Sequence, residues 1–208
     1  KHAVELSIAA QEAGADALLV VTPYYNKATQ KGLIMHYDKV LEKTTLPIIL
    51  YNVPGRTGMN YAIPTLKELA KSDRIVAIKE ASGSIEYATE VAKECPELTM
   101  YSGNDDMIVP ILSLGGMGVI SVLSNVAPRE THDLCQKWFD GDVKGSREMQ
   151  LKYLELIKSL FCEVNPIPVK TAMNMMGFNA GLLRLPLCEM VPENYKRLEN
   201  AMKECNLI

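Results

Sequence analysis

The stretch RIVAIKEASG, Arg74–Gly83, decides the fold and points to the chemistry. Its apolar run from Ile75 to Ile78 is continuous instead of alternating, which is typical of a parallel strand buried on both faces. Lys79 follows the run directly, so we expect it at the carboxyl end of the strand, where parallel α/β folds bind their ligands.

Lys79 has the environment that a nucleophilic amine requires. A lysine flanked by apolar residues loses hydration, which lowers the pKa of its ammonium group and makes the free amine available to attack a carbonyl. A lysine that merely extends its charge from the strand end into water would give the same segment. This stretch alone leaves both interpretations open.

Strand-like and helix-like segments alternate along the first part of the chain. The other predicted strands are residues 17–21, 48–51, 98–101 and 119–123, and the predicted helices between them are residues 31–43, 64–71, 84–94 and 106–114. Such alternation indicates right-handed βαβ units around a parallel sheet. Gly115, Gly116 and Gly118 precede a predicted strand, whereas the glycines of a dinucleotide-binding motif follow one.

We therefore predict an α/β fold of the (β/α)8 TIM-barrel type, represented here by about its last five βα units and followed by a C-terminal helical appendage. The strand pattern stops after about residue 140, and helices are predicted at residues 143–161, 167–176 and 192–205. This divides the chain into a partial catalytic barrel, residues 1–140, and an α-helical domain, residues 141–208.

Composition excludes several classes of function. The chain has 208 residues, 48% of them hydrophobic, and a formal net charge of −3, which gives no reason to expect nucleic acid or an anionic membrane as a partner. No apolar run approaches the length of a transmembrane helix. The five cysteines are widely spaced without a CxxC pair, which argues for reduced thiols in the cytoplasm, and the three histidines are scattered, which argues against a metal site.

Polar residues follow every predicted strand, and in a barrel these ends converge on one site. Tyr51 ends its run and would lie beside Lys79, with a hydroxyl able to transfer a proton, although a packing tyrosine could occupy the same place. Arg56 follows a Pro-Gly turn and could bind a carboxylate through two hydrogen bonds, although a surface arginine would look the same. Tyr24 and Tyr25, on a proline-stiffened loop, are candidates for a subunit contact.

Six motifs together resemble the dihydrodipicolinate synthase and N-acetylneuraminate lyase family of pyruvate-dependent class I aldolases, and the likeness covers essentially the whole chain. They are TPYYN at 22–26, YNVPGRTG at 51–58, IKEASG at 78–83, SGND at 102–105, LGGMGVISV at 114–122 and NPIPVK at 165–170. The second and third are similar to the branch that condenses pyruvate with L-aspartate-4-semialdehyde, because sialic acid lyases usually differ after the lysine and lack the arginine.

The resemblance implies that a lysine Schiff base with pyruvate attacks the semialdehyde, in the diaminopimelate and lysine pathway. The implied roles are Schiff-base formation for Lys79, proton donation and acceptance for Tyr51, a proton relay across subunits for Tyr25, binding of the semialdehyde carboxylate for Arg56, and lining of the pyruvate pocket by backbone groups of Gly103 and Ile120. It further implies no metal or organic cofactor, a homotetramer built as a dimer of dimers, and a cytoplasmic location.

Two other functions stay open from the sequence. One is a sibling aldolase that cleaves N-acetylneuraminate or a 2-keto-3-deoxy sugar acid, and the other is a non-catalytic barrel with a regulatory or structural role. The family's opening strands, roughly three of eight barrel units, and the threonines of its proton relay are absent. We therefore expect a partial chain whose activity needs that segment. Lysine-inhibited members usually carry a glutamate where His2 stands, so we do not expect feedback inhibition by lysine, although Tyr24 matches one of their allosteric contacts.

Overall fold

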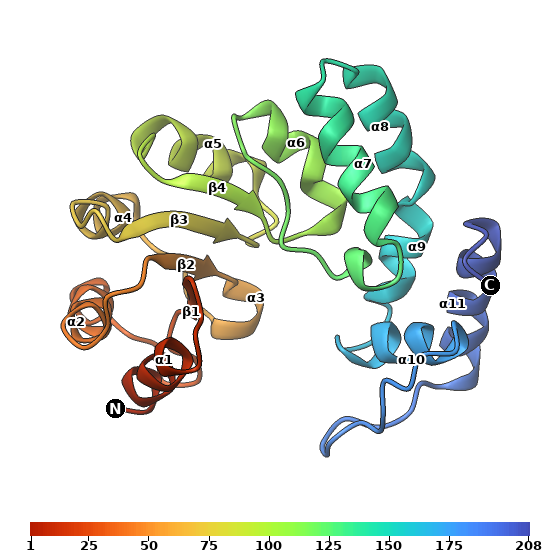
Figure 1. The fold of residues 1–208 in the computed structure, drawn as a ribbon, viewed down its shortest axis with the longest axis horizontal. Coiled ribbons are helices and arrows are strands. Elements are labelled where there is room, and N and C mark those ends of the chain that lie inside the picture. The colour runs from red at the N-terminus through yellow and green to blue at the C-terminus, as the bar shows by residue number, and fades with distance from the viewer. The chain divides into compact units, whose positions relative to one another are not determined.

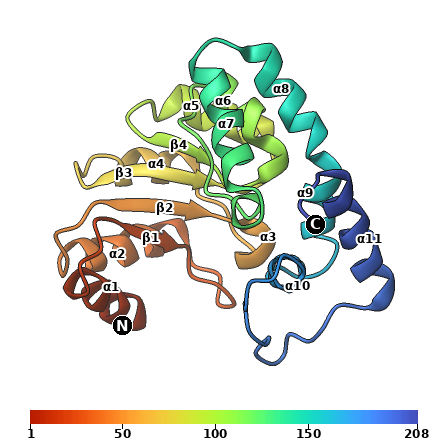
Figure 2. The same cartoon turned by 45° about the vertical axis from the view of Figure 1, so that its right-hand side comes forward.

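The computed structural model describes residues 1–208, whose contacts divide them into two units, Lys1–Ile120 and Ser121–Ile208 (Figures 1 and 2). The first unit contains all four strands, and the second is helical. Each unit has its own hydrophobic core. The domain boundary at residue 140 stays a prediction.

The first unit is built on a parallel sheet whose strands follow one another in space as they do in sequence, in the order β1-β2-β3-β4. Its strands are β1 (Leu18–Val21), β2 (Ile48–Asn52), β3 (Ile75–Glu80) and β4 (Thr99–Ser102). Parallel neighbours need a crossover, and helices supply it between successive strands. The predicted α/β class and the repeated βα units are confirmed.

The first unit contains seven helical segments, two of which begin at a capping hydroxyl group. They are α1 (His2–Glu12), α2 (Gln30–Leu41), α3 (Pro54–Thr57), α4 (Ile63–Leu69), α5 (Ile85–Glu94), the 3-10 turn η1 (Asp105–Met107) and α6 (Ile108–Ser113). The Thr29 hydroxyl accepts a hydrogen bond from Gly32 N at the start of α2, and the Ser84 hydroxyl accepts one from Tyr87 N at the start of α5. Each such cap contributes about 1 kcal/mol because it satisfies an exposed helix N–H group.

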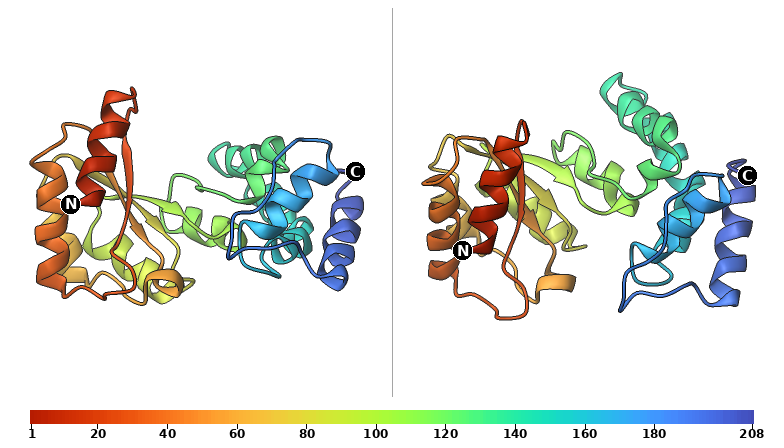
Figure 3. Two further views of the ribbon diagram at one scale, coloured as in Figure 1. Left: turned by 90° about the horizontal axis from the view of Figure 1, so that it is seen from below. Right: turned by 60° about the horizontal axis from the view of Figure 1, so that its bottom comes forward.

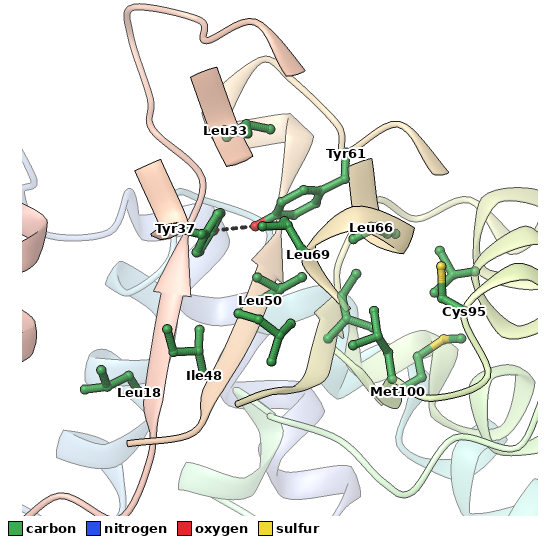
Figure 4. Close-up of a cluster of buried hydrophobic side chains, with 14 of the residues drawn as sticks. Leu18, Leu33, Tyr37, Ile48, Leu50, Tyr61, Leu66, Leu69, Cys95 and Met100 are labelled. Carbon is green, nitrogen blue, oxygen red and sulfur yellow. Dashed lines mark hydrogen bonds between the residues drawn. The ribbon is translucent and has the colours of Figure 1, made fainter. Parts of the chain in front are cut away.

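The core of the first unit lies between the sheet and its covering helices (Figure 4). Residues of β2 alternate between buried and half-buried, so Ile48 and Leu50 share one face and pack with helix residues such as Leu33 and Leu66. Tyr37 and Tyr61 lie in the same cluster with their hydroxyl groups hydrogen-bonded. The helix-covered face of the sheet is therefore buried, and its residues below the strand ends are apolar.

The second unit consists of η2 (Leu123–Asn125), α7 (Pro128–Phe139), α8 (Val143–Lys152), α9 (Leu154–Leu160), α10 (Ile167–Met175) and α11 (Pro192–Glu204) (Figure 3). Its core is formed by α9, α10 and α11, with Leu156, Leu160, Leu198 and Met202 almost fully buried. The predicted C-terminal helical region is confirmed. No helix in the chain has both the length and the apolar character needed to cross a bilayer.

Two predicted elements are wrong in their extent. The strand expected at residues 119–123 is reduced to one isolated bridge between Ser102 and Val119, because the chain turns where the Ser121 hydroxyl accepts a hydrogen bond from Ser124 N and η2 begins. The sheet therefore has four strands in place of five. The helix expected at residues 143–161 is interrupted at Tyr153, where ψ is 1° and α8 ends. The short α3 and the whole of α7 were not predicted.

Candidate active site at the strand ends

A row of side chains crosses the sheet at the carboxyl ends of its strands. In the strand register Tyr51 pairs with Lys79, and Lys79 pairs with Tyr101. All three residues are half-buried, in contrast to their buried neighbours on the opposite face. The Lys79 Nζ lies 4.3 Å from the centroid of the Tyr51 ring. The two residues proposed from sequence to act together are thus in direct contact.

Burial makes the Lys79 amine easier to deprotonate. Loss of hydration lowers the pKa of Lys79 from its ordinary value, and the negative charge of Asp105 opposes this shift. Burial is the larger effect, so the neutral amine is more abundant than on an exposed lysine. A neutral amine with a tyrosine hydroxyl on the neighbouring strand is the minimum that carbonyl addition and proton transfer require.

Tyr51 keeps its proton more firmly than a free tyrosine. Burial raises the pKa of Tyr51, and the positive charge of Arg56 partly offsets the rise. Arg56 lies on α3, which starts with Pro54 and ends at Gly58 in the left-handed conformation, with φ of 72°. The short helix thus places an exposed guanidinium close enough to influence the Tyr51 hydroxyl.

The backbones of Gly103 and Ile120 are fixed to the same strand ends. Gly103 N donates a hydrogen bond of 2.7 Å to the Glu80 carbonyl, and Ile120 N donates one of 2.9 Å to the Ser102 carbonyl. A Cβ atom on Gly103 would lie 2.5 Å from the Ala81 Cβ, so only glycine fits here without displacing the turn after β3. Gly103 therefore lies beside the end of β3, which bears Lys79, and Ile120 lies beside the end of the neighbouring β4.

The model of the Dihydrodipicolinate synthetase family matches residues 1–205 of the chain. The chain belongs to this family. A 4-hydroxy-tetrahydrodipicolinate synthase of Caldicellulosiruptor bescii is 59% identical over 202 residues, with 97% of this chain and 68% of the relative covered. One from Clostridium perfringens is 56% identical over 209 residues, with 100% of this chain and 72% of the relative covered.

Solved structures of dihydrodipicolinate synthases have the same fold. The structure from Thermotoga maritima superposes with a TM-score of 0.94 at 44% identity, covering 99% of this chain and 71% of that one. A pyruvate complex from Acinetobacter baumannii gives 0.93 at 40% identity, covering 99% and 71%. The fold of the chain is thus a partial TIM barrel of the Dihydrodipicolinate synthetase family with a C-terminal helical region.

The family resemblance predicted from the six motifs is confirmed by these matches. By close homology the function is that of a 4-hydroxy-tetrahydrodipicolinate synthase, a class I aldolase-type lyase of diaminopimelate and lysine biosynthesis that uses pyruvate. The chain covers about 70% of the length of such enzymes. The roles of individual residues are not addressed by these matches and stay predictions.

Tyr25 is a predicted site residue that the Dihydrodipicolinate synthetase fold of this chain does not bring to Lys79. It lies on the loop between β1 and α2, and its side chain is 92% exposed, so it packs against neither Lys79 nor Tyr51. Its φ of 68° is in the left-handed region, which costs a residue with a Cβ about 1 kcal/mol or more. The chain thus holds an exposed aromatic side chain in a strained backbone conformation.

Sequence reasoning missed several polar residues that surround the site. Asp105 is 2% exposed, and its negative charge raises the pKa of Lys79. Glu80 and Asn52 are buried on the opposite face of the sheet and are hydrogen-bonded to each other. All three lie within motifs that the family resemblance includes. The signal that could have found Glu80 and Asn52 is their position, because the pleat turns the residue after Lys79 and the residue after Tyr51 toward the helices.

Proposed function

We propose that Lys79 forms the imine with pyruvate and that Tyr51 transfers the protons of the reaction. The Lys79 amine adds to the ketone carbon of pyruvate, and water leaves as the C=N bond forms. Loss of a proton from the methyl group gives an enamine, whose carbon attacks the aldehyde of L-aspartate-4-semialdehyde, and hydrolysis then releases the product and the amine. The imine itself is the electron sink of this sequence. The observation that carries the proposal is the contact between Lys79 Nζ and the Tyr51 ring.

Tyr51 is suited to proton transfer because its hydroxyl stays neutral at physiological pH. A neutral phenol next to the reacting nitrogen can donate a proton to the departing hydroxide and accept it again at hydrolysis. Its half-buried position limits access of competing water. Gly103 and Ile120 would line the pyruvate end of the site with their backbones, which the hydrogen bonds to β3 and β4 hold in place.

Arg56 would bind the carboxylate of the semialdehyde. A guanidinium offers two parallel N–H donors that match a carboxylate, and it keeps its charge at any physiological pH. The residue distinguishes this substrate from a sugar acid, the substrate of sibling aldolases. Replacement of Arg56 by alanine should raise KM for the semialdehyde far more than KM for pyruvate, and equal changes would favour a different role.

Tyr25 would complete the proton relay in the active site of a partner subunit, within a homotetramer made of two tight dimers. The support is its exposed ring on a backbone held in the left-handed region, since such strain is retained where function uses it. Sedimentation of the full-length protein tests this, and an active monomer would contradict it. A cytoplasmic location is supported by five cysteines that are all free thiols.

Borohydride reduction in the presence of pyruvate tests the central proposal. It should fix the pyruvate-derived group on Lys79, detectable as added mass on the peptide that contains residue 79, and Lys79→Arg should abolish the label. A label on another lysine would refute the assignment, and the absence of any label would favour a non-catalytic barrel. Comparing the 208-residue chain with a chain that also carries the additional barrel units of its relatives tests the expectation that activity needs those units.

A further inference from the structure

A second row of side chains lies behind the row that contains Lys79. Asn52, Glu80 and Ser102 occupy paired positions on three neighbouring strands, and their exposed fractions are 0%, 3% and 0%. The pleat directs them to the helix-covered face, where the preceding residues on that side of β2, Ile48 and Leu50, are apolar. Polar groups buried in such a layer destabilise the fold unless hydrogen bonds compensate them.

Glu80 makes those hydrogen bonds to two different segments. Its Oε2 accepts from Asn52 Nδ2 at 2.7 Å, and its Oε1 accepts from the backbone N–H of Ser82 at 2.6 Å. Asn52 Nδ2 also donates to the Asn60 side-chain oxygen at 3.0 Å. One carboxylate and one amide thus connect the turn after β3, the end of β2 and the segment that follows α3.

The connection continues to the loop that contains Tyr25. The Asn60 backbone carbonyl accepts a hydrogen bond of 2.9 Å from Gln30 Nε2, and Gln30 Oε1 accepts one of 2.9 Å from Ala62 N. Gln30 is the first residue of α2, directly after that loop. The Glu80 backbone carbonyl in turn accepts from Gly103 N. This hydrogen-bond chain therefore links the segments that bear Lys79, Tyr51, Arg56 and Gly103, and it ends at Gln30, directly after the Tyr25 loop.

We propose that Glu80 is a positioning residue, which acts through Asn52 and Asn60 to fix the relative placement of Lys79, Tyr51 and the Arg56 segment. The inference rests on the proposed function, because it assigns a supporting role to residues behind that site. Positioning matters for such chemistry because a displacement of about 1 Å can lower a rate about a hundredfold.

The orientation of Asn52 supports this role. Its Nδ2 makes both donations, while its Oδ1 is buried without a hydrogen-bond partner. An unpaired buried oxygen destabilises the fold, so the amide is held in this orientation by the two acceptors that it serves. Burial also raises the pKa of Glu80, which the hydrogen bonds from Ser82 and Asn52 partly offset. Asn52 and Glu80 are paired positions at the carboxyl ends of β2 and β3, directly after Tyr51 and Lys79.

The test compares Glu80→Ala, Glu80→Gln and Thr44→Ala in the full-length protein. Thr44→Ala is the control, because it removes a buried hydrogen bond at the opposite end of β2, from Thr44 Oγ1 to the Val40 carbonyl. With saturating pyruvate, Glu80→Ala should slow borohydride-trapped labelling of Lys79 about tenfold or more, whereas Thr44→Ala should not. Glu80→Gln should restore most of the rate, because the amides at 52 and 60 can rotate and rebuild the chain with reversed polarity.

A second variant keeps the test decisive if Glu80→Ala folds poorly, and amide hydrogen exchange adds a readout if it folds. Asn60→Ala removes an exposed side chain, so the fold should persist, and it should raise KM for the semialdehyde without slowing pyruvate labelling, since only the Arg56 segment is released. Amide hydrogen exchange at Ser82 should accelerate in Glu80→Ala, because the acceptor of that N–H is lost. This second readout does not depend on the chemistry of the site.

The outcomes separate the two proposals. Absence of a label on Lys79 in the wild-type protein would overturn the proposed function. A labelled wild type whose Glu80→Ala variant labels as fast as the Thr44→Ala control would overturn the positioning role alone. Failure of Glu80→Gln to recover the rate would also contradict it, because the effect would then come from the charge of Glu80 and not from its hydrogen bonds.

Discussion

The two rows of side chains at the strand ends are adjacent in sequence but differ in burial and in the face of the sheet on which they lie. One row contains Tyr51, Lys79 and Tyr101, and the other contains the residue that follows each of them, Asn52, Glu80 and Ser102. The first row is half-buried, and the second is sealed beneath the helices. A pleated strand thus places neighbouring residues in two different environments. One suits reacting groups, and the other suits groups that hold them in place.

Burial favours the neutral form of the titratable group in both rows. It lowers the pKa of Lys79 and raises the pKa of Glu80, because in each case the charged form loses hydration. For Lys79 the result is a better nucleophile. For Glu80 the result is a carboxyl group that depends on hydrogen bonds from Ser82 and Asn52.

The largest effect is expected within the reacting row. Tyr51→Phe removes the proton-transfer group and should lower kcat by about a hundredfold or more, the usual contribution of a general acid or base. The matched control is Tyr101→Phe, since Tyr101 pairs with Lys79 from the other side. Steady-state kinetics of both variants decide the matter. Equal losses would show that proximity to Lys79, and not the identity of Tyr51, determines activity.

The apolar parts of the two faces should differ in stability. Leu50 is fully buried against the helices, whereas Leu19 on the opposite face is 45% exposed. Leu50→Ala should lower the free energy of unfolding by about 2–5 kcal/mol because it leaves a cavity. Leu19→Ala should lower it by less than about 1 kcal/mol in this chain. Denaturant titration of the 208-residue chain measures both, and equal losses would mean that the second face is also covered.

The smallest effect is expected from the charge next to Lys79. The Asp105 carboxylate favours the ammonium form, so Asp105→Asn should lower the pKa of Lys79 further. The free amine would then be available at lower pH, and the pH dependence of imine formation should move toward acid. Initial rates of borohydride trapping across pH measure the shift, and a move toward alkaline pH would contradict the assigned electrostatics.

Much of this arrangement could be predicted from the sequence because the end of an apolar run marks the end of a strand. The apolar runs before Lys79 and Tyr51 end within two residues of the observed strand ends, and the two residues pair in the sheet. Four of the five predicted strands are present for the same reason.

The remaining features depend on information that a local pattern does not contain. The segment at residues 119–123 is as apolar as a strand, but its backbone pairs with β4 only at Val119 before it turns. The break at Tyr153 lies inside a continuous amphipathic pattern. The pairing of Glu80 with Asn52 joins residues 28 positions apart and depends on the register of β2 and β3.

The left-handed conformation of Tyr25 has a consequence for the evolution of the chain. Glycine or asparagine at this position would relieve the backbone and leave an exposed loop otherwise unchanged. Directed evolution for thermal stability alone would therefore replace this tyrosine. Its retention in a screen that rewards catalysis, and its loss in one that rewards only heat resistance, would reveal what the phenol ring contributes.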